Sequence, residues 1–423
     1  MQQDKGAKMD GNHETSAYRA LRKSAYRRKY EKALLFGGKR FTFSALLART
    51  EYAYNTFRQM GVEPGERVCL CLPNCPDLLA SFYGLSRLGA VGVLAHPASS
   101  ARELKMQMEA SGARRLITTA RQYEEYCKRE RPLPPGRLII CRPESDMRGK
   151  VKRAYLALQT PAEEEIKGYI LDELIAENRY SASETPSGGG EQPAVILFGT
   201  SCFINARPIL YSAQELQHTV EEFWRHQEMV STVLIENSFA TEGGFLAAHS
   251  ALCTGRAIYW NVGDPIALAI KAKPDFLVGT EEFFWNFRQQ QGLAHLKWNH
   301  LQGGFQIGKD LTPLMEKFAG RAFAAAGGRG ILSSAPVPLK VRREPLFFVR
   351  DFGVRLSDME REIALIEGIG KCRCIAEGGG IRLKVLPDGK DAVKTLGRGI
   401  VSCCRREMNA LHLPRSVEFC TSL

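Results

Sequence analysis

In the segment Ile196–Ser212, two adjacent hydroxyl residues follow a short apolar run, and one cation follows them. A loop that binds phosphate needs glycines, so that backbone N–H groups can converge on the anion, together with hydroxyl donors and a positive charge. Thr200 and Ser201 supply hydroxyls and Arg207 supplies the charge, but bulky side chains at 202–204 replace the small residues that such a loop requires. The sequence therefore predicts a degenerate phosphate loop.

The cysteines and histidines have no metal-binding spacing. Twelve cysteines and eight histidines are scattered along the chain, with no C-x-x-C or H-E-x-x-H motif. Cys69 and Cys71, like Cys372 and Cys374, are two residues apart, which on a strand places each pair on one face as small hydrophobic residues. We therefore assign no metal ligand and, in the absence of a G-x-S-x-G motif, no catalytic residue.

The net charge of +12 is concentrated near the start of the chain. The segment Tyr18–Lys32 carries seven Lys or Arg against one Glu, which is +6 of the total. Tyr18, Arg22, Tyr26 and Tyr30 recur every four residues, so an amphipathic helix is expected. Such a helix can bind RNA or anionic lipid, but we favour a scaffold helix with a solvated basic face.

Length and composition predict an ordinary globular protein. At 423 residues with 44% hydrophobic content, the chain can form two or three domains with a sizeable core. Its first sixteen residues lack an apolar stretch, and no run of about 18 apolar residues occurs, so neither a secretory signal nor a transmembrane segment is expected. The expected location is the cytoplasm, where dispersed cysteines stay reduced.

The elements that position these residues begin with a βαβ unit. Val68–Leu72 is a short apolar strand, residues 78–88 carry one apolar helical face, and Val91–Leu94 begins another strand. The surrounding sequence contains FTFSALL, GVEPGERVCLCLPNCPDLLASFYGLSRLGAVGVLAHP and ELKMQMEASGARRLIT. Over Phe41–Thr119 the chain resembles the front of the acyl-CoA synthetase and adenylate-forming superfamily. The resemblance implies an α/β fold, with these motifs serving as scaffold.

The resemblance also locates a possible ligand pocket. Ser181–Pro193 is a Ser/Gly/Pro-rich linker, and the altered phosphate loop follows it. Leu301–Phe318 resembles the segment in which the family's glycine pair lies beside the nucleotide and acyl pocket. Gly303 and Gly304, followed by Phe305, are therefore candidates for a pocket wall that a ligand backbone can approach closely.

Several of the family's catalytic motifs are missing. The segment with the magnesium-binding glutamate is replaced by residues with no glutamate before Glu344, and the β-barrel with its ribose-binding aspartate is largely absent. Phe347–Glu360 already resembles the hinge and first helix of the family's small C-terminal domain. Arg350 is kept at the hinge, but Asp351 replaces the expected glycine. The chain ends at Leu423, before the segment that contains the family's catalytic lysine.

These observations predict an α/β fold with two parts. Residues 1–345 form a large N-terminal core of βα units as in adenylate-forming enzymes, with a linker at about 181–193 and the β-barrel subdomain largely missing. Residues 346–423 form a small, truncated C-terminal α+β domain.

The function expected from this resemblance is that of a degenerate AMP-binding, acyl-CoA synthetase-like protein. Losing one electrostatic contact to developing charge costs about 10²- to 10³-fold in rate, and here several such contacts are changed together. We therefore predict a pseudoenzyme that retains at most acyl, CoA or carrier-protein binding. One alternative is a divergent ATP-dependent carboxylate ligase, which would use ATP and Mg²⁺ as cofactors. The other is a non-catalytic partner subunit of an intact synthetase.

The basic charge favours anionic partners through long-range steering. CoA and acyl carrier protein are both anionic and belong to the chemistry of the resembled family, and an intact synthetase is a third possible partner. Nucleic acid is not expected. If the N-terminal helix is exposed, the candidate contacts are Arg19, Arg22, Arg27 and Arg28.

Overall fold

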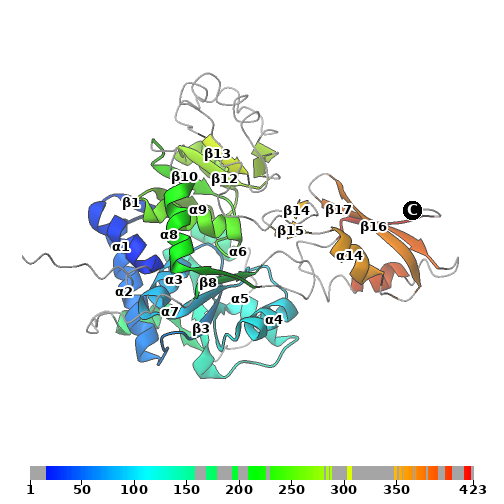
Figure 1. The fold of residues 1–423 in the computed structure, drawn as a ribbon, viewed down its shortest axis with the longest axis horizontal. Coiled ribbons are helices and arrows are strands. Elements are labelled where there is room, and N and C mark those ends of the chain that lie inside the picture. The colour runs from blue at the N-terminus through cyan, green and yellow to red at the C-terminus, as the bar shows by residue number, and fades with distance from the viewer. Residues whose placement is uncertain are drawn as a thin grey trace, which may run out of the picture.

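The computed structural model describes two α/β sheets with their helices and a small C-terminal α+β unit (Figure 1). The described residues are 16–157, 168–178, 193–198, 208–224, 229–280, 283–284, 286–287, 303–306, 347–349, 352–354, 356–364, 366, 368–377, 380–388, 396–402 and 414–420. The α/β class and the large N-terminal core of βα units are confirmed. No closed barrel occurs within these ranges.

The first sheet has seven strands in the order β7-β6-β5-β3-β4-β8-β9. Its strands are parallel except for β9, which returns antiparallel to β8 as the second arm of a hairpin. The bounds are β3 Arg67–Cys71, β4 Val91–Leu94, β5 Arg115–Thr119, β6 Leu138–Cys141, β7 Tyr169–Ile170, β8 Pro193–Phe198 and β9 Pro208–Ser212.

The second sheet has six strands in the order β13-β12-β10-β11-β1-β2. All neighbouring strands in it are parallel except the β1–β2 hairpin. The bounds are β1 Lys32–Phe36, β2 Lys39–Thr42, β10 Thr232–Ile235, β11 Ala257–Trp260, β12 Phe276–Gly279 and β13 Gly303–Gln306.

Helices cover both faces of each sheet. The helices of the N-terminal part are α1 Ala17–Arg27, α2 Phe43–Gln59, α3 Pro76–Leu88, α4 Ala101–Ser111, α5 Ala120–Cys127, α6 Gly149–Ala157, α7 Leu171–Glu177, α8 Ala213–Phe223, α9 Glu242–Cys253 and α10 Pro265–Ala272, with short 3-10 helices η1 Pro135–Arg137 and η2 Pro143–Asp146.

Alternation along the strands divides the apolar residues among separate layers. Val68 and Leu70 of β3 face the largest core, which lies between the two sheets and contains α3 and α9. Cys69 and Cys71 point to the opposite face, where they pack under α4 and α5. The prediction that these two cysteines fill the core from one face of a strand is therefore confirmed, because both are fully buried.

The predicted βαβ unit is confirmed as β3, α3 and β4. Helix α3 begins with Pro76 at its first position and ends at Gly89, whose φ of 78° is left-handed and suits glycine. Nearly every residue of α3 is buried, so the helix is enclosed on all sides. Gly84 allows α2 to pack closely, since a Cβ there would lie 3.0 Å from the backbone nitrogen of Tyr54.

An aromatic cluster joins α3 to α9 and so to the second sheet. The ring of Phe82 on α3 lies 5.3 Å from that of Phe245 on α9 and 5.6 Å from Phe239, in edge-to-face arrangements. Tyr83 Oη and His249 Nδ1 are hydrogen-bonded at 3.0 Å, and both residues are buried. The two sheets are therefore joined through interlocked side chains of α3 and α9.

A buried ion-pair network fixes the start of α3. Arg49 on α2 donates from Nε to Asp77 in the first turn of α3 at 2.7 Å, and its Nη2 lies 2.8 Å from Asp146 of η2. Asp172 of α7 is 3.6 Å from the same nitrogen. Burial raises the pKa of Asp77 to about 6, although the charge of Arg49 opposes this shift. One guanidinium thus connects four helical elements.

Helix α1 is amphipathic as predicted, but it ends at Arg27, before Tyr30. Tyr18 is buried against the core, whereas Tyr26 and Tyr30 are 66% and 82% exposed. Four residues turn a helix by 400°, so each step of the tyrosine pattern moves 40° around the axis and leaves the buried face. The helix packs on α2, α3 and α9, as a scaffold helix does.

The C-terminal elements have a core of their own. Strands β14 Phe347–Val349 and β15 Phe352–Val354 pair antiparallel, and α14 Leu356–Ile363 precedes a sheet of β16 Ile369–Glu377, β17 Gly380–Pro387 and β18 Ser416–Phe419. Cys374 is buried and Cys372 packs against the same core. The proposed boundary at 345/346 stays a prediction. Across the described residues, no helix combines the length and apolarity that crossing a membrane would require.

We expect Arg49→Met to lower the free energy of unfolding by about 3 to 5 kcal/mol, because it leaves the buried Asp77 without its cation. Without Arg49 the folded-state pKa of Asp77 rises further above the unfolded value of 3.8. The free energy of unfolding of the variant therefore falls as pH rises and Asp77 ionises. Urea denaturation should therefore give a smaller loss at about pH 5 than at about pH 8. Arg40→Met, which removes an exposed arginine, is the control; equal losses in the two variants would contradict the network's role.

The buried His249 should make folding acid-sensitive. Burial lowers the pKa of His249 from 6.5 to about 4, so the unfolded chain binds an extra proton in this window. The contribution of neutral His249 to the free energy of unfolding is fully present above about pH 6.5. It falls by about 3 kcal/mol as pH drops to 4. We expect His249→Gln to flatten this slope, whereas His218→Gln on an exposed position of α8 should leave it unchanged. Denaturation curves across the window with identical slopes for all three proteins would show that His249 is not responsible.

Candidate functional site

The carboxyl ends of β10 and β12 form the candidate site. From β10 the chain passes to β11 on one side and then returns to β12 on the other, so the connections diverge between β10 and β12. In open parallel sheets, ligands bind in the crevice outside the carboxyl ends at such a switch point. We name the polar residues at this point, Glu236, Asn237 and Thr280, the strand-end crevice.

Backbone and side-chain hydrogen bonds hold the two strand ends together. The N–H of Glu236 donates to the carbonyl of Val278 at 2.9 Å, which extends the β10–β12 ladder by one residue. The N–H of Thr280 donates back to Oε2 of Glu236 at 3.3 Å. The Glu236 carboxylate therefore faces the residue that follows β12, and its position is set by the neighbouring strand.

Asn74 connects the crevice to the first sheet. It lies between β3 and α3, and its Nδ2 donates to the carbonyl of Asn237 at 2.8 Å. Its Oδ1 accepts from the N–H of Phe239 at 2.7 Å. A single amide side chain thus satisfies one acceptor and one donor of the loop after β10, and it fixes the loop's path over the start of α3.

The side chain of Asn237 is fully buried. Among the residues that the structure describes, neither its Nδ2 nor its Oδ1 has a hydrogen-bond partner. A buried amide without partners costs about 1 to 3 kcal/mol per group, so such a residue calls for a specific reason. A polar ligand or water reaching this position would remove that cost.

The loop that follows turns tightly into α9. Thr241 caps the helix by accepting from the N–H of Gly244, and its hydroxyl donates to the carbonyl of Ser238 at 2.7 Å. A Cβ at Gly244 would lie 2.0 Å from the Ser238 oxygen, so only glycine fits. Glu242 accepts a short hydrogen bond from Tyr211 of β9, which ties the β8–β9 hairpin to the start of α9. Burial, and then the charge of Glu242, raises the pKa of Tyr211.

The residues predicted for the phosphate loop and hinge lie outside the described part of the chain. Thr200, Ser201 and Arg207 fall between β8 and β9, and Arg350 and Asp351 fall between β14 and β15. The apolar run before the loop forms β8. The assignments of these five residues stay predictions.

The predicted pocket residues lie on β13. Gly303 and Gly304 pair with Phe276 and Leu277 in the first half of β12, and Phe305 pairs with Val278 nearer its carboxyl end. The glycine pair is therefore inside the strand, and Phe305 is the residue of the three that approaches the level of the crevice. Their role as a pocket wall stays a prediction.

Sequence reasoning did not identify the residues that form the crevice. Glu236 and Asn237 follow the apolar run of β10, and Thr280 follows that of β12. Polar residues directly after short buried strands were a usable signal for them. Asn74 carried no such signal, because its partners lie 163 and 165 residues away.

The crevice supplies polar binding groups. Glu236 is a carboxylate already engaged with a backbone N–H, Asn237 is an amide, and the Thr280 hydroxyl accepts from the N–H of Phe283 at 3.1 Å. In the described ranges, no three His, Cys, Asp or Glu side chains are grouped as metal ligands would be. The groups in this crevice can orient a polar ligand.

The known proteins that this chain resembles include AMP-binding enzymes and CoA ligases. Residues 21–200 match the family model described as AMP-binding enzyme. The rice protein named 4-coumarate–CoA ligase 3, from Oryza sativa subsp. japonica, is 37% identical over 83 residues, which are 20% of this chain and 15% of that protein. The alignment thus spans about a seventh of this curated relative's length.

Solved structures extend the similarity of fold over most of the chain. The amide bond synthetase McbA from Marinactinospora thermotolerans superposes with a TM-score of 0.69 at 13% identity, covering 96% of each chain. The o-succinylbenzoate CoA synthetase from Bacillus subtilis, solved with a CoA product analogue, gives a TM-score of 0.67 at 10% identity over 96% of this chain and 95% of that one.

We expect Asn74→Ala to lower the free energy of unfolding by about 2 to 4 kcal/mol, because it leaves one backbone acceptor and one donor of the loop without partners. Hydrogen exchange at the Phe239 amide should accelerate in the same variant. Asn261→Ala is the matched control, since that side chain donates to the carbonyl of Gly263 within an exposed turn. Unchanged exchange at Phe239 would show that Asn74 does not hold the loop.

Proposed function

We propose that this protein, a member of the adenylate-forming superfamily, binds a CoA-type or acyl ligand without forming an acyl-adenylate. It would then be a pseudoenzyme of the AMP-binding, acyl-CoA ligase-like family. The proposal separates the scaffold, which supports ligand binding, from the phosphate loop, whose residue types do not suit catalysis.

The observation that carries the proposal is the contrast between the hairpin and its loop. Strands β8 and β9 are paired from Pro193–Ser212 to Phe198–Pro208, and Tyr211 ties them to α9. Of the nine residues between them, 199–207, those at 202–204 carry bulky side chains where backbone N–H groups would have to converge on phosphate. A supporting frame of the family type thus holds a loop of unsuitable composition.

The polar groups of the strand-end crevice are also poorly suited to binding a nucleotide together with Mg²⁺. Magnesium requires oxygen ligands in near-octahedral geometry, usually from one or two carboxylates together with phosphate oxygens. Glu236 is the carboxylate of the strand-end crevice, and one of its oxygens accepts from Thr280 N–H. We therefore derive no adenylation step through a bound nucleotide.

A CoA thioester is the ligand class that we favour. The Bacillus subtilis neighbour was solved with a CoA product analogue. The strand-end crevice offers an amide and a hydroxyl, which suit the neutral amide groups of a pantetheine arm better than they suit a triphosphate. Acyl carrier protein carries the same arm and is the related protein ligand. The acyl group is left open.

A divergent ligase is the second candidate. Glu236 at the end of β10 favours it, because it places a carboxylate beside the end of β12, where a substitute metal ligand or proton-transfer group could act. An active enzyme would combine that carboxylate with Arg207.

Calorimetric titration with ATP and Mg²⁺, together with a pyrophosphate-release assay over a panel of carboxylic acids, distinguishes the two candidates. We expect the dissociation constant for ATP to exceed about 1 mM, which corresponds to less than about 4 kcal/mol of binding free energy. We also expect no release of pyrophosphate. Titration with CoA and a set of acyl-CoA thioesters should give measurable heats. The Arg207→Ala variant should behave like the parent protein.

Two results would contradict the proposal. A low-micromolar ATP affinity that disappears in Arg207→Ala, or pyrophosphate release that disappears in Glu236→Gln, would establish the ligase instead. No binding of any CoA thioester in the panel would remove the ligand-binding function.

A further inference from the structure

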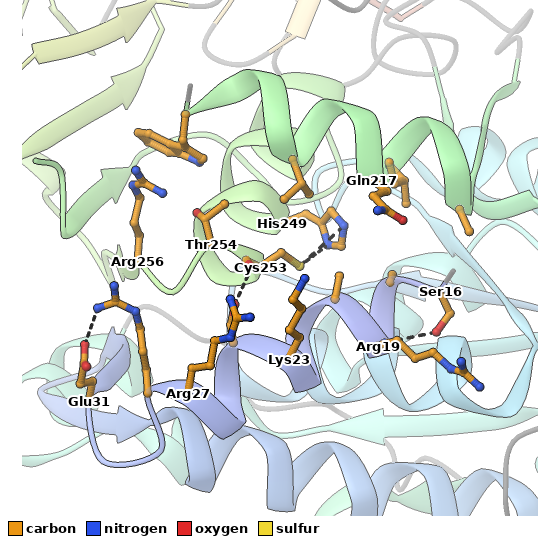
Figure 2. Close-up of a pocket in the computed structure, with 18 residues that line it drawn as sticks. Ser16, Arg19, Lys23, Arg27, Glu31, Gln217, His249, Cys253, Thr254 and Arg256 are labelled. Carbon is orange, nitrogen blue, oxygen red and sulfur yellow. Dashed lines mark hydrogen bonds and ion pairs between the residues drawn. The ribbon is translucent and has the colours of Figure 1, made fainter. Parts of the chain in front are cut away.

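A groove of about 1050 Å³ lies between α1, α8 and the end of α9 (Figure 2). Helix α1 forms one wall, α8 forms the other, and Cys253 and Thr254 close it at the end of α9. We name this the α1–α8 groove. Glu236 and Asn237 of the strand-end crevice precede α9, whereas the groove is lined by His249, Cys253 and Thr254 from the later part of that helix and its end.

A row of cations follows the α1 wall. Arg19, Lys23 and Arg27 line the groove at four-residue intervals, and Figure 2 shows Lys23 and Arg27 extending from α1 toward α8 and the end of α9. In a helix such residues form an i, i+4 ridge with a rise of about 6 Å per step, or about 12 Å from Arg19 to Arg27. The charge is therefore arranged along a line.

Two more arginines lie at one end of this row. Arg256 is 9% exposed and stacks on the ring of Trp224, with its Cζ 4.6 Å from the ring centroid. Burial, and then the charge of Arg28, lowers the pKa of Arg256 to about 10. Glu31 is the carboxylate that lines this part of the groove, and it pairs with Arg28 at 2.8 Å. Cations outnumber carboxylates along the described lining five to one.

The lining of the groove also includes apolar residues. Ala17 and Ala20 contribute small side chains from α1, while Leu216, Val220 and Trp224 contribute larger ones from the α8 side. Trp224 is held in place by donating from Nε1 to Ser250 Oγ at 3.1 Å. The groove thus combines apolar lining residues with a basic wall.

We propose that the α1–α8 groove binds an acidic amphipathic helix of a partner protein. A helix with acidic residues at i, i+4 and i+8 repeats its charge at the same interval of about 6 Å, and an adjacent apolar face would cover the alanines and Val220. Arg19, Lys23 and Arg27 extend over two helical turns, which is a greater length than a compact anion would contact. The inference goes beyond the proposed function and does not depend on it, because the groove shares no residue with the strand-end crevice.

Anisotropy titrations with labelled helical peptides test this proposal. One peptide carries glutamates at i, i+4 and i+8 beside a leucine face, and the second has the same composition with the spacing scrambled. We expect the periodic peptide to bind at least about tenfold more tightly at low salt and to weaken as salt rises. A single-stranded RNA of equal charge is the third probe.

Matched variants of α1 provide the controls. The double variant Lys23→Glu, Arg27→Glu should weaken binding of the periodic peptide by about tenfold or more, because both side chains line the groove. Arg22→Glu makes the same type of charge change on the same helix at a residue outside the groove lining, and should change affinity by less than about twofold. Circular dichroism checks that each variant remains helical.

Three outcomes would overturn the inference: equal binding of the periodic and scrambled peptides, an equal effect of Arg22→Glu and the double variant, or preferential binding of RNA. No binding of the periodic peptide at low salt would also exclude it. Titration of CoA thioesters with the double variant separates the two proposals, since ligand binding at the crevice should survive the α1 substitutions.

Discussion

The position of α3 depends on one buried charge pair, Arg49 with Asp77, and much of the molecule depends on α3. Most of the helix surface is buried in apolar contacts, which are not directional and do not by themselves fix the helix along or around its axis. Two hydrogen-bonding nitrogens of Arg49 remove that freedom at the first turn. The carboxylate also favours the positive end of the helix dipole. Asn74, three residues upstream of Asp77, is thereby held where it can reach the loop after β10 in the other sheet.

The fold could be predicted from local patterns more completely than the site. Strand–helix–strand periodicity was sufficient for β3, α3 and β4, and the two-residue spacing of Cys69 and Cys71 was sufficient for their common face. The strand-end crevice depends instead on contacts between segments far apart in the sequence, and no local period encodes the pairing of Asn74 with the Asn237 backbone. The tyrosines of α1 illustrate a third case, in which a spacing of four residues fits a helix but drifts away from its buried face.

The core packs independently of the segment between β8 and β9. Under the proposed function, this independence lets the scaffold persist while catalytic motifs change. The main core is formed by residues of both sheets together with α3 and α9. Residues 199–207 connect β8 and β9 in the sequence, and these two strands are already paired with each other. Loops of this kind tolerate substitution because the packing of the core does not depend on them. Replacing phosphate-binding glycines there would abolish chemistry at little cost to folding.

Helix α9 relates the crevice to the groove, since the Thr241 cap lies at one end and Cys253 at the other. Transmission of a signal between them would require α9 to adopt a second arrangement. Its Phe245 and His249 are fixed in the aromatic cluster with Phe82 and Tyr83, and most of the helix is buried, so moving it would disturb the contact between the two sheets. A helix bound in the α1–α8 groove is therefore expected to bring a partner to the protein while leaving the affinity of the crevice unchanged, because the rigid packing that positions both sites opposes coupling between them.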